Sequence, residues 1–373
     1  MNFAFSEEQQ MLRDSVRSFL ENKAPSAHVR ELMETESGFD EGLWQEMAEM
    51  GWQAMAIPEE YGGAGFSWLE LNIINEELGR SLLPSPFFST VVLGATAVLL
   101  GGTEEQKKSL LEQVSIGQLR LALAHVEPGG DWGPEGVQAT ARRDGDGWVL
   151  DGAKSFVVDG HTADTLIVAA RTDAGVSLFL VPGDAAGVSR ERLETMDMTR
   201  KQASVTLDGV AVPDDALLGT DGGGEELLDR VMQFAAVALA NEQVGGAQKC
   251  MEMSVEYAKV RVQFGRPIGS FQAIKHKCAD MLLSVESSKS AAYYSSWAAS
   301  EGNDELPVTS ALAKSYCSDA YFDVAAETIQ VHGGIGFTWE HDAHLYFKRA
   351  KTSQLMLGEP AFYRKRLADL IGL

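Results

Sequence analysis

The spacing of apolar residues changes twice along the chain, and this restricts the fold more than any other feature of the sequence. From residue 1 to about 118, apolar residues recur at helical spacing, as Leu71, Ile74 and Leu78 do. Between about 119 and 219 they form short runs rich in Val, Leu, Phe and Thr, separated by Gly, Asp and Pro. From about 224 the helical spacing returns and continues to residue 373.

This order predicts an α+β protein with an N-terminal helical domain at 1–118, a β domain at 119–223 and a C-terminal four-helix bundle at 224–373. Thr103 is expected to cap a helix that begins at Glu104. We expect an antiparallel barrel or sandwich with strands near 120–126, 148–158, 165–171, 176–181 and 203–207. Since strands and helices do not alternate, a Rossmann dinucleotide fold is not expected.

Charge and composition exclude several classes of partner. The chain has 54 Asp and Glu against 31 Lys and Arg, and its net charge of −23 argues against nucleic-acid and membrane-surface partners. The apolar runs at 91–100 and 234–240 are too short to span a bilayer, and residues 1–15 lack the features of a signal peptide. The cysteines Cys250, Cys278 and Cys317 form no CxxC pair, which favours a reducing cytoplasm.

The segment 257–272, YAKVRVQFGRPIGSFQ, carries the clearest chemistry. We expect a helix with Arg261 in its last turn, a break at Gly265 and Pro267, and a second helix that has Gln272 in its first turn. Arginine forks onto phosphate oxygens, Phe264 offers an apolar face, and a glutamine amide both donates and accepts hydrogen bonds. The segment therefore suits a dinucleotide, although an ordinary helical hairpin with a basic last turn fits its composition as well.

A second segment, QVHGGIG at 330–336, combines the amide of Gln330 with Gly333 and Gly334 at the end of a helix. Glycines allow backbone N–H groups to approach a ligand closely, although glycine-rich helix ends are common. His341 and His344 stand three positions apart beside Glu340 and Asp342, and we interpret them as a solvated helix start without a metal.

Both segments resemble motifs of the FAD-dependent acyl-CoA dehydrogenase family, YAxxRxQFGxPIxxFQ and Gln-x-x-Gly-Gly, and the order of the three expected domains resembles that family too. The resemblance implies an acyl-CoA substrate, FAD as cofactor and an electron-transfer flavoprotein as electron acceptor. It also implies that six residues hold the adenine and diphosphate of a neighbouring subunit's FAD: Arg261, Phe264, Gln272, Gln330, Gly333 and Gly334.

The positions that carry the catalytic base in this family are empty here. Its members remove an α-proton with a carboxylate while a hydride passes to the flavin. The family segment Tyr-Glu-Gly-Thr matches residues 356–359, which puts Leu357 in place of the base, and a second known base position matches Ala235. Next to the flavin ring, Val126 and Val158 replace two family hydroxyls. Neither leucine nor alanine can accept a proton.

This pattern resembles the base-lacking subunits of bacterial heteromeric acyl-CoA dehydrogenases. It implies an α2β2 enzyme in which a paralogous subunit supplies the base, and a bacterial cytoplasmic location. One alternative is a self-sufficient homotetramer whose base is Glu242 or Glu359. Another is a scaffold that binds neither FAD nor CoA.

Overall fold

The computed structural model describes residues 5–373, and the chain forms two compact units. We call them the helical unit, with residues 5–30, Trp68–Leu83 and Ala236–Leu373, and the strand unit, with Glu31–Ser67 and Pro84–Ala235. None of the helices in the described residues is both long and apolar enough to cross a membrane. These two compact units combine segments that are far apart in the chain, so they do not coincide with the three expected domains. The domain boundaries at 118 and 223 stay a prediction.

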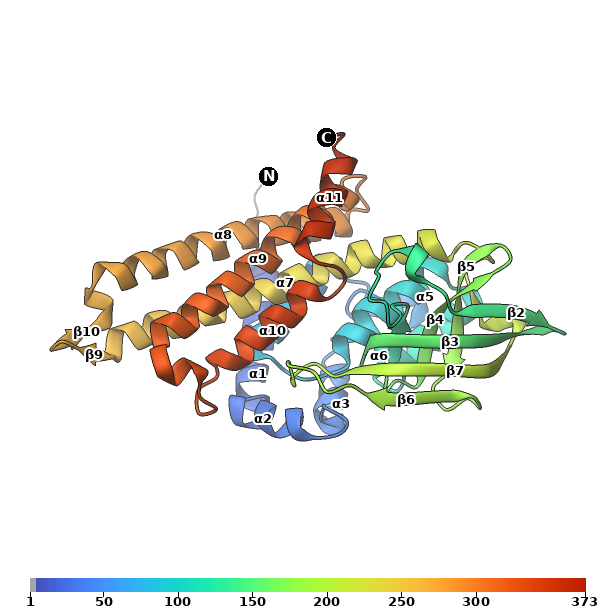
Figure 1. Cartoon of the computed structure of the whole chain (residues 1–373), viewed down its shortest axis with the longest axis horizontal. Helices are drawn as coiled ribbons and strands as arrows, with labels where there is room; N and C mark the ends of the chain where they lie inside the picture. Colours follow the sequence, from blue (N-terminus) through green and yellow to red (C-terminus); the bar gives the residue numbers. More distant parts are fainter. Residues whose placement is uncertain (1–4) are drawn as a thin grey trace. The chain divides into compact units, whose positions relative to one another are not determined.

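The helical unit is built around three long antiparallel helices that lie side by side (Figure 1). They are α7 (Gly224–Val260, in this unit from Ala236 onward), α8 (Gln272–Ser300) and α9 (Leu306–His332). Small side chains line their contact, Ala240 and Val244 meeting Ala292, Ala313 and Cys317. The remaining helices are α1 (Glu7–Lys23), α4 (Trp68–Ser81), α10 (Ala343–Leu355) and α11 (Pro360–Leu370), and α2 (Ser26–Glu34) begins here.

Two glycines allow α4 and α7 to approach closely. A side chain at Gly79 would collide with the backbone carbonyl of Glu242, and one at Gly245 would collide with that of Glu76. Glu76 and its neighbour Glu77 are buried and bind arginines of α1: Arg13 lies 2.7 Å from Glu76, and Arg17 lies 2.6 Å from Glu77. Buried carboxylates need such partners, so these pairs fix α1 against α4.

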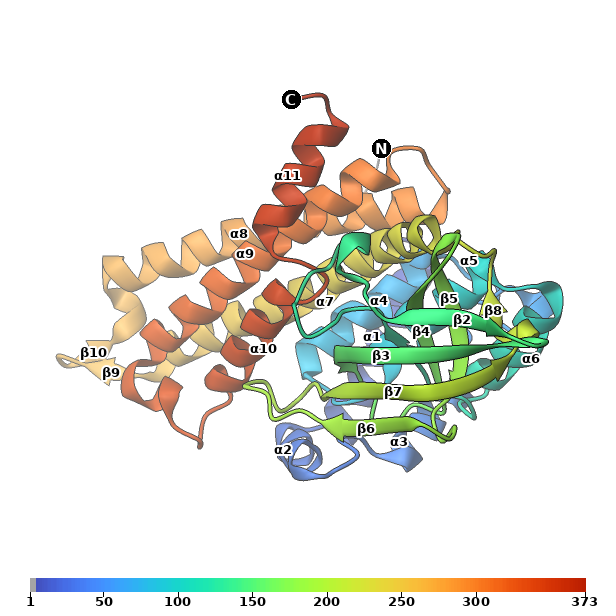
Figure 2. The same cartoon turned by 45° about the vertical axis from the view of Figure 1, so that its right-hand side comes forward.

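The strand unit contains one mostly antiparallel sheet with the order β6-β7-β3-β2-β4-β5-β8, and β1 pairs in parallel with β4. Figure 2 shows β2, β3, β7 and β6 side by side. The strands are β1 (Leu121–Ala124), β2 (Thr140–Asp144), β3 (Gly147–Val158), β4 (Thr165–Thr172), β5 (Gly175–Pro182), β6 (Val188–Arg192), β7 (Gln202–Pro213) and β8 (Leu217–Leu218). All five expected strands form, while β2, β6 and the two-residue β8 were not expected. The predicted α+β class is confirmed.

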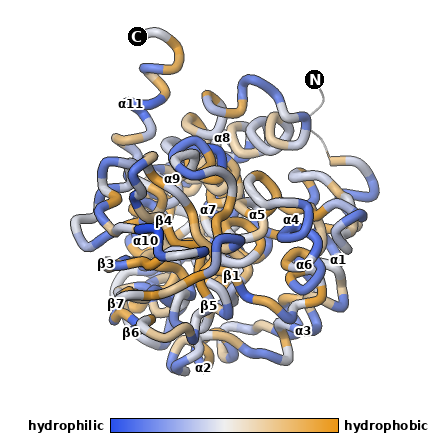
Figure 3. The backbone as a smooth tube through the Cα atoms, turned by 90° about the vertical axis from the view of Figure 1, so that its right-hand side faces the viewer, coloured by the Kyte–Doolittle hydropathy of each residue, from blue (hydrophilic) through white to orange (hydrophobic). Residues whose placement is uncertain are grey.

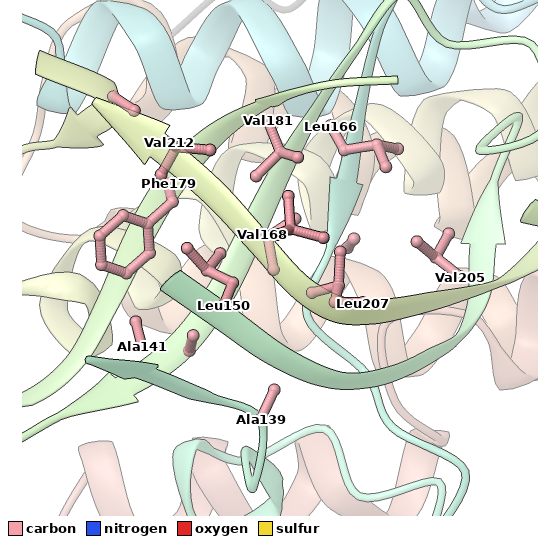
Figure 4. Packing of buried hydrophobic residues seen from close by; sticks show 14 of the residues in the cluster. Ala139, Ala141, Leu150, Leu166, Val168, Phe179, Val181, Val205, Leu207 and Val212 are labelled. Carbon is pink, nitrogen blue, oxygen red and sulfur yellow. The ribbon is translucent and has the colours of Figure 1, made fainter. Parts of the chain in front are cut away.

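The core of the sheet is made of alternating inward residues (Figure 4). Leu150 of β3, Val168 of β4, Phe179 of β5 and Val205 of β7 are completely buried. In Figure 3, which colours the backbone by hydropathy, the central strands of the sheet are mostly hydrophobic. This cluster gives the unit a core of its own, held by apolar burial.

Several helices of the strand unit precede the sheet in the chain, and the start of α7 follows it. The preceding helices are α3 (Glu41–Glu49), the short η1 (Glu59–Tyr61), the π-helical η2 (Phe88–Ala95), α5 (Thr96–Gly101) and α6 (Glu104–Ser115). Thr103 caps α6 as predicted, and Gln106 closes a capping box with it. The π-helical stretch was not expected, since its apolar spacing does not distinguish it from an α-helix.

Candidate cofactor and substrate site

The corner between α7 and α8 is a tight β-hairpin. α7 ends at Val260, one residue earlier than expected, and the N–H of Arg261 donates to the carbonyl of Tyr257 at 2.8 Å. Strands β9 (Val262–Gln263) and β10 (Arg266–Pro267) then pair across a two-residue turn. The turn residues Phe264 and Gly265 both have positive φ, 52° and 78°. Two-residue hairpins require this backbone, which glycine adopts easily and phenylalanine does not.

Phe264 is therefore held in a strained conformation while its ring points away from the protein. Its exposed fraction is 91%. A left-handed backbone costs such a residue on the order of 1 kcal/mol or more. Within the described chain the ring meets Phe271 edge to face, at a centroid distance of 6.0 Å, and the rest of its surface is open. An exposed aromatic side chain under backbone strain indicates a contact with something outside this chain.

The three polar side chains that the sequence selected all face outward. The side chains of Arg261, Gln272 and Gln330 are exposed and form no hydrogen bond or ion pair with the part of the chain that the structure describes. Gln272 is the first residue of α8, as predicted. A guanidinium and two amides without internal partners can bind a ligand without first breaking bonds within the protein.

The structure brings the second segment to the same end of the helical unit (Figure 1). The ring of Tyr257, one turn before Arg261, stacks on His332 at a centroid distance of 4.4 Å, and Lys277 of α8 pairs with Glu327 of α9. Directly after His332 the chain turns through Gly333, with φ of 65°, and both Gly333 and Gly334 are exposed.

This set of groups fits the ADP part of FAD. Arg261 offers a planar fork for a diphosphate, Phe264 a ring face, and the amides and exposed glycine N–H groups offer hydrogen bonds to ribose and base. Because all of these groups lie on the outer surface of one helical unit, they form an open surface that can hold part of a dinucleotide.

The segment expected to carry the base forms a buried turn after α10. Leu357 has an exposed fraction of 3% and a φ of 63°, and Gly358 follows with a φ of 110°. The hydroxyl of Tyr363 donates to the carbonyl of Leu357 at 3.0 Å. The other base position, Ala235 on α7, is completely buried. Hydrocarbon therefore fills both positions.

A buried lysine that sequence reasoning missed holds this turn. Lys314 of α9 is completely buried, and its ammonium donates to the Ser318 hydroxyl at 2.9 Å. It also donates, at 3.2–3.3 Å, to the carbonyls of Ser353, Gln354 and Gly358. Burial lowers the pKa of Lys314 to about 7. The carbonyl dipoles at the end of α10 face the ammonium and favour its charged form.

The two carboxylates considered as replacement bases lie in different environments. Glu242 is buried on α7, and Arg349 of α10, also buried, binds its Oε1 at 3.1 Å. Glu359 is exposed and immediately precedes Pro360, the first residue of α11. A buried carboxylate needs a partner of opposite charge, and the pair with Arg349 gives Glu242 a structural role.

In the strand unit, the side chains aligned with the lost family hydroxyls are also buried and apolar. Val126 and Val158 have exposed fractions of 3% and 5%. The carbonyl of Val126 accepts the N–H of Ser155 at 2.8 Å, and Phe156 adopts a φ of 56°. The backbone of these segments is thus ordered, while neither valine offers a hydrogen bond to a flavin edge.

Next to Val126, a buried ionic group fixes the loop. Lys154 is completely buried and donates to Glu127 at 2.7 Å, and the same carboxylate oxygen accepts the N–H groups of Gln138 and Ala139 at 2.8 Å. Burial, and secondly the charge of Lys154, lower the pKa of His125 to about 3, so this imidazole is neutral at pH 7. The sequence signal was a lysine inside a strand, which needs a buried partner.

The histidines near α10 lie against other aromatic rings and beside an ion pair. Asp342 binds Arg30 at 2.8 Å, and the rings of His341 and His332 lie 4.3 Å apart. Within residues 5–373, no group of three His, Cys, Asp or Glu side chains has the arrangement of a metal site. Burial lowers the pKa of His344 to about 4, which keeps this ring neutral.

Comparison with known proteins defines the class. Three family models match nearly the whole chain: the acyl-CoA dehydrogenase N-terminal domain at 6–118, the middle domain at 122–210 and the C-terminal domain at 222–371. The chain therefore belongs to the acyl-CoA dehydrogenase family, whose members are FAD-dependent oxidoreductases. The resemblance that the motifs at 257–272 and 330–336 indicated is confirmed.

Particular relatives include a mycobacterial enzyme and chains of two-component proteins. The acyl-CoA dehydrogenase IpdE2 of Mycolicibacterium smegmatis is 36% identical over 363 residues, which cover 97% of this chain and 98% of that protein. Among solved structures, a chain of the ChsE4-ChsE5 complex from Mycobacterium tuberculosis matches with a TM-score of 0.92 and 29% identity, covering 100% of this chain and 99% of that one. A chain from a variant of the Tcur3481-Tcur3483 steroid ACAD matches with a TM-score of 0.89 and 35% identity over 98% of both chains.

Proposed function

We propose that this chain is the base-lacking subunit of an α2β2 acyl-CoA dehydrogenase that desaturates an acyl-CoA thioester between its α and β carbons. It supplies the ADP-binding half of an FAD site that it shares with a paralogous subunit. The observation that carries the proposal is a contrast: Arg261, Gln272 and Gln330 are exposed without partners in the described chain, while Leu357 fills the base position with a buried hydrocarbon.

The residues of this chain divide the work as follows. FAD would supply the acceptor for the hydride. Arg261 donates to the diphosphate oxygens, the amides of Gln272 and Gln330 orient ribose and base, and the N–H groups of Gly333 and Gly334 approach the ligand closely. Since Leu357 cannot take a proton, the carboxylate that removes the α-proton comes from the partner.

The relatives support a heteromer and suggest the substrate. ChsE4 and ChsE5 form a complex, and Tcur3481-Tcur3483 is a steroid enzyme. We extend both properties to this chain: a paralogous partner, and a CoA thioester from the oxidation of a steroid or fatty-acid chain. An electron-transfer flavoprotein is the proposed electron acceptor, and a cytoplasmic location stays a prediction.

The test is co-expression of this chain with a paralogue that retains the family glutamate. We expect an αβ complex with about one FAD per pair, and Arg261→Gln should reduce the bound FAD while the complex still forms. Lys365→Gln, which removes an exposed charge on α11, is the matched control. A fully flavinated and active homotetramer of this chain alone would contradict the proposal.

The homotetramer alternative retains one accessible candidate base, Glu359. If Glu359 removes the proton, Glu359→Gln abolishes turnover and leaves FAD bound. We expect instead that turnover of the complex is unchanged. A complex that is colourless in every preparation would favour the scaffold alternative, because oxidised flavin absorbs visible light.

A further inference from the structure

The corner around Arg261 carries more positive charge than a diphosphate ligand needs. From residue 257 to 279 the chain has five Lys or Arg and no Asp or Glu, although the whole chain has a net charge of −23. The five residues are Lys259, Arg261, Arg266, Lys275 and Lys277. A basic segment of this kind makes the electrostatic potential locally positive on the surface of an otherwise acidic protein.

Ion pairs neutralise only some of these cations. Lys259 pairs with Glu256, and Lys277 pairs with Glu327. Arg261, Arg266 and Lys275 are exposed and have no carboxylate partner within the described residues. The guanidinium of Arg266 lies 4.2 Å from the ring centroid of Phe271. This contact orients the arginine side chain, but the ring carries no net charge that would neutralise the cation.

These charges lie where an anionic ligand approaches the corner. Arg266 forms part of β10, directly after the turn at Phe264, and Lys275 lies less than one turn after Gln272 on α8. At physiological salt the Debye length is about 8 Å, so cations close to the binding surface dominate the potential that a ligand meets there. The acidic surface elsewhere repels the same ligand.

We propose that Arg266 and Lys275 form, with Arg261, a cationic approach surface that accelerates association of the nucleoside diphosphate part of FAD. Arg261 binds the diphosphate, while Arg266 and Lys275 raise the rate of encounter without contacting the bound ligand. This inference rests on the proposed function and adds to it how a strongly acidic assembly captures an anionic cofactor.

The experiment measures FAD uptake by the αβ complex after its FAD has been removed. Stopped-flow flavin fluorescence gives the association rate constant at several salt concentrations, and dilution into excess competitor gives the dissociation rate constant. Arg266→Gln and Lys275→Gln should each lower the association rate constant about three- to tenfold at low ionic strength, with little effect in high salt. Dissociation should change less than about twofold, since electrostatic steering acts on encounter.

Two controls separate charge from packing and from net charge. Arg266→Lys keeps the charge and should restore the wild-type association rate if the loss in Arg266→Gln is electrostatic. Lys365→Gln removes the same charge on α11, at the other end of the helical unit from β9 and β10 (Figures 1 and 2), and should leave the association rate unchanged.

The outcomes distinguish this inference from the proposed function. If the wild-type complex binds FAD and both Gln variants associate as Lys365→Gln does, the approach surface is refuted and the proposed function stands. Faster dissociation at an unchanged association rate refutes it as well, because Arg266 or Lys275 would then contact the bound ligand. If the wild-type complex takes up no FAD, both proposals fail.

Discussion

The pair of Glu242 and Arg349 gives the sharpest test of whether a catalytic carboxylate has been relocated in this chain. Both side chains are buried in the helical unit, 3.1 Å apart. Removing one member breaks this buried ion pair, and breaking a buried pair from one side costs about 3–5 kcal/mol in other proteins. Glu242→Met should therefore lower the free energy of unfolding of the helical unit by about this amount. The midpoint of thermal unfolding should fall by roughly 6–20 °C.

The double variant Glu242→Met, Arg349→Met separates structure from chemistry. It replaces both charges by side chains of similar length, and such replacements are often neutral or stabilising in other proteins. We expect the double variant to regain most of the stability that the single variant loses. Since the proposed base belongs to the partner, the double variant should also regain turnover in the αβ complex.

The assay combines thermal unfolding, followed by circular dichroism, with turnover of the acyl-CoA substrate. A different result would refute the structural role of Glu242: if the Met variant keeps its stability and its FAD but loses turnover, and the second substitution does not restore it, Glu242 is a base. Arg364→Met provides a control, because its ion pair with Asp319 is exposed and contributes at most about 1 kcal/mol.

Three further predictions follow from buried or strained groups. Burial lowers the pKa of Lys314 to about 7 in the folded chain, so between about pH 7 and 10 only the unfolded chain binds this proton. The free energy of unfolding of the wild type should therefore rise with pH in this window, relative to that of Lys314→Met, and urea unfolding at several pH values measures it. The pKa of His125 is lowered to about 3 in the folded chain, so between about pH 6.5 and 3 only the unfolded chain binds this proton. The free energy of unfolding should therefore fall as the pH falls towards 3, and it should fall less in His125→Phe; acid unfolding of both proteins measures the difference. Phe264→Asn should relieve about 1 kcal/mol of backbone strain and raise the unfolding midpoint, while equilibrium titration should show weaker FAD binding.

Local sequence signals predicted the cap of α6 and the helix ends on both sides of the corner. The cap at Thr103 and the corner at Arg261 and Gln272 depend on residues close together in the chain, and they form within one residue of the expected positions. The strands that were missed have weaker signals. β2 reads TARRD and β6 reads VSRER, and charged residues in short strands look like turns when the pairing partner is unknown.

Groups that depend on tertiary contacts could not be predicted. The sequence shows Lys314 only as a lysine within a helical pattern, where an exposed end is the usual expectation. Its role depends on carbonyls about 40 residues later, at the end of α10. Arg349 on α10, which pairs with Glu242, is likewise not identifiable from spacing. Periodicity reports which face of a helix is buried, not which side chain meets it there.

In the helical unit, the polar groups around the turn at Leu357 are buried and hydrogen-bonded, whereas the polar side chains at the corner between α7 and α8 are exposed. Around the turn at Leu357, Lys314 donates to the carbonyl of Gly358 and Tyr363 donates to the carbonyl of Leu357, so buried side chains hold this backbone. At the corner, Arg261, Gln272 and Gln330 remain exposed and unpaired within the described chain. Exposed polar side chains without protein partners cost little, because water solvates them. An aromatic residue at positive φ costs backbone strain energy that water does not remove. The strain at Phe264 therefore argues that the corner is retained for an external ligand, while the rigid turn preserves the fold.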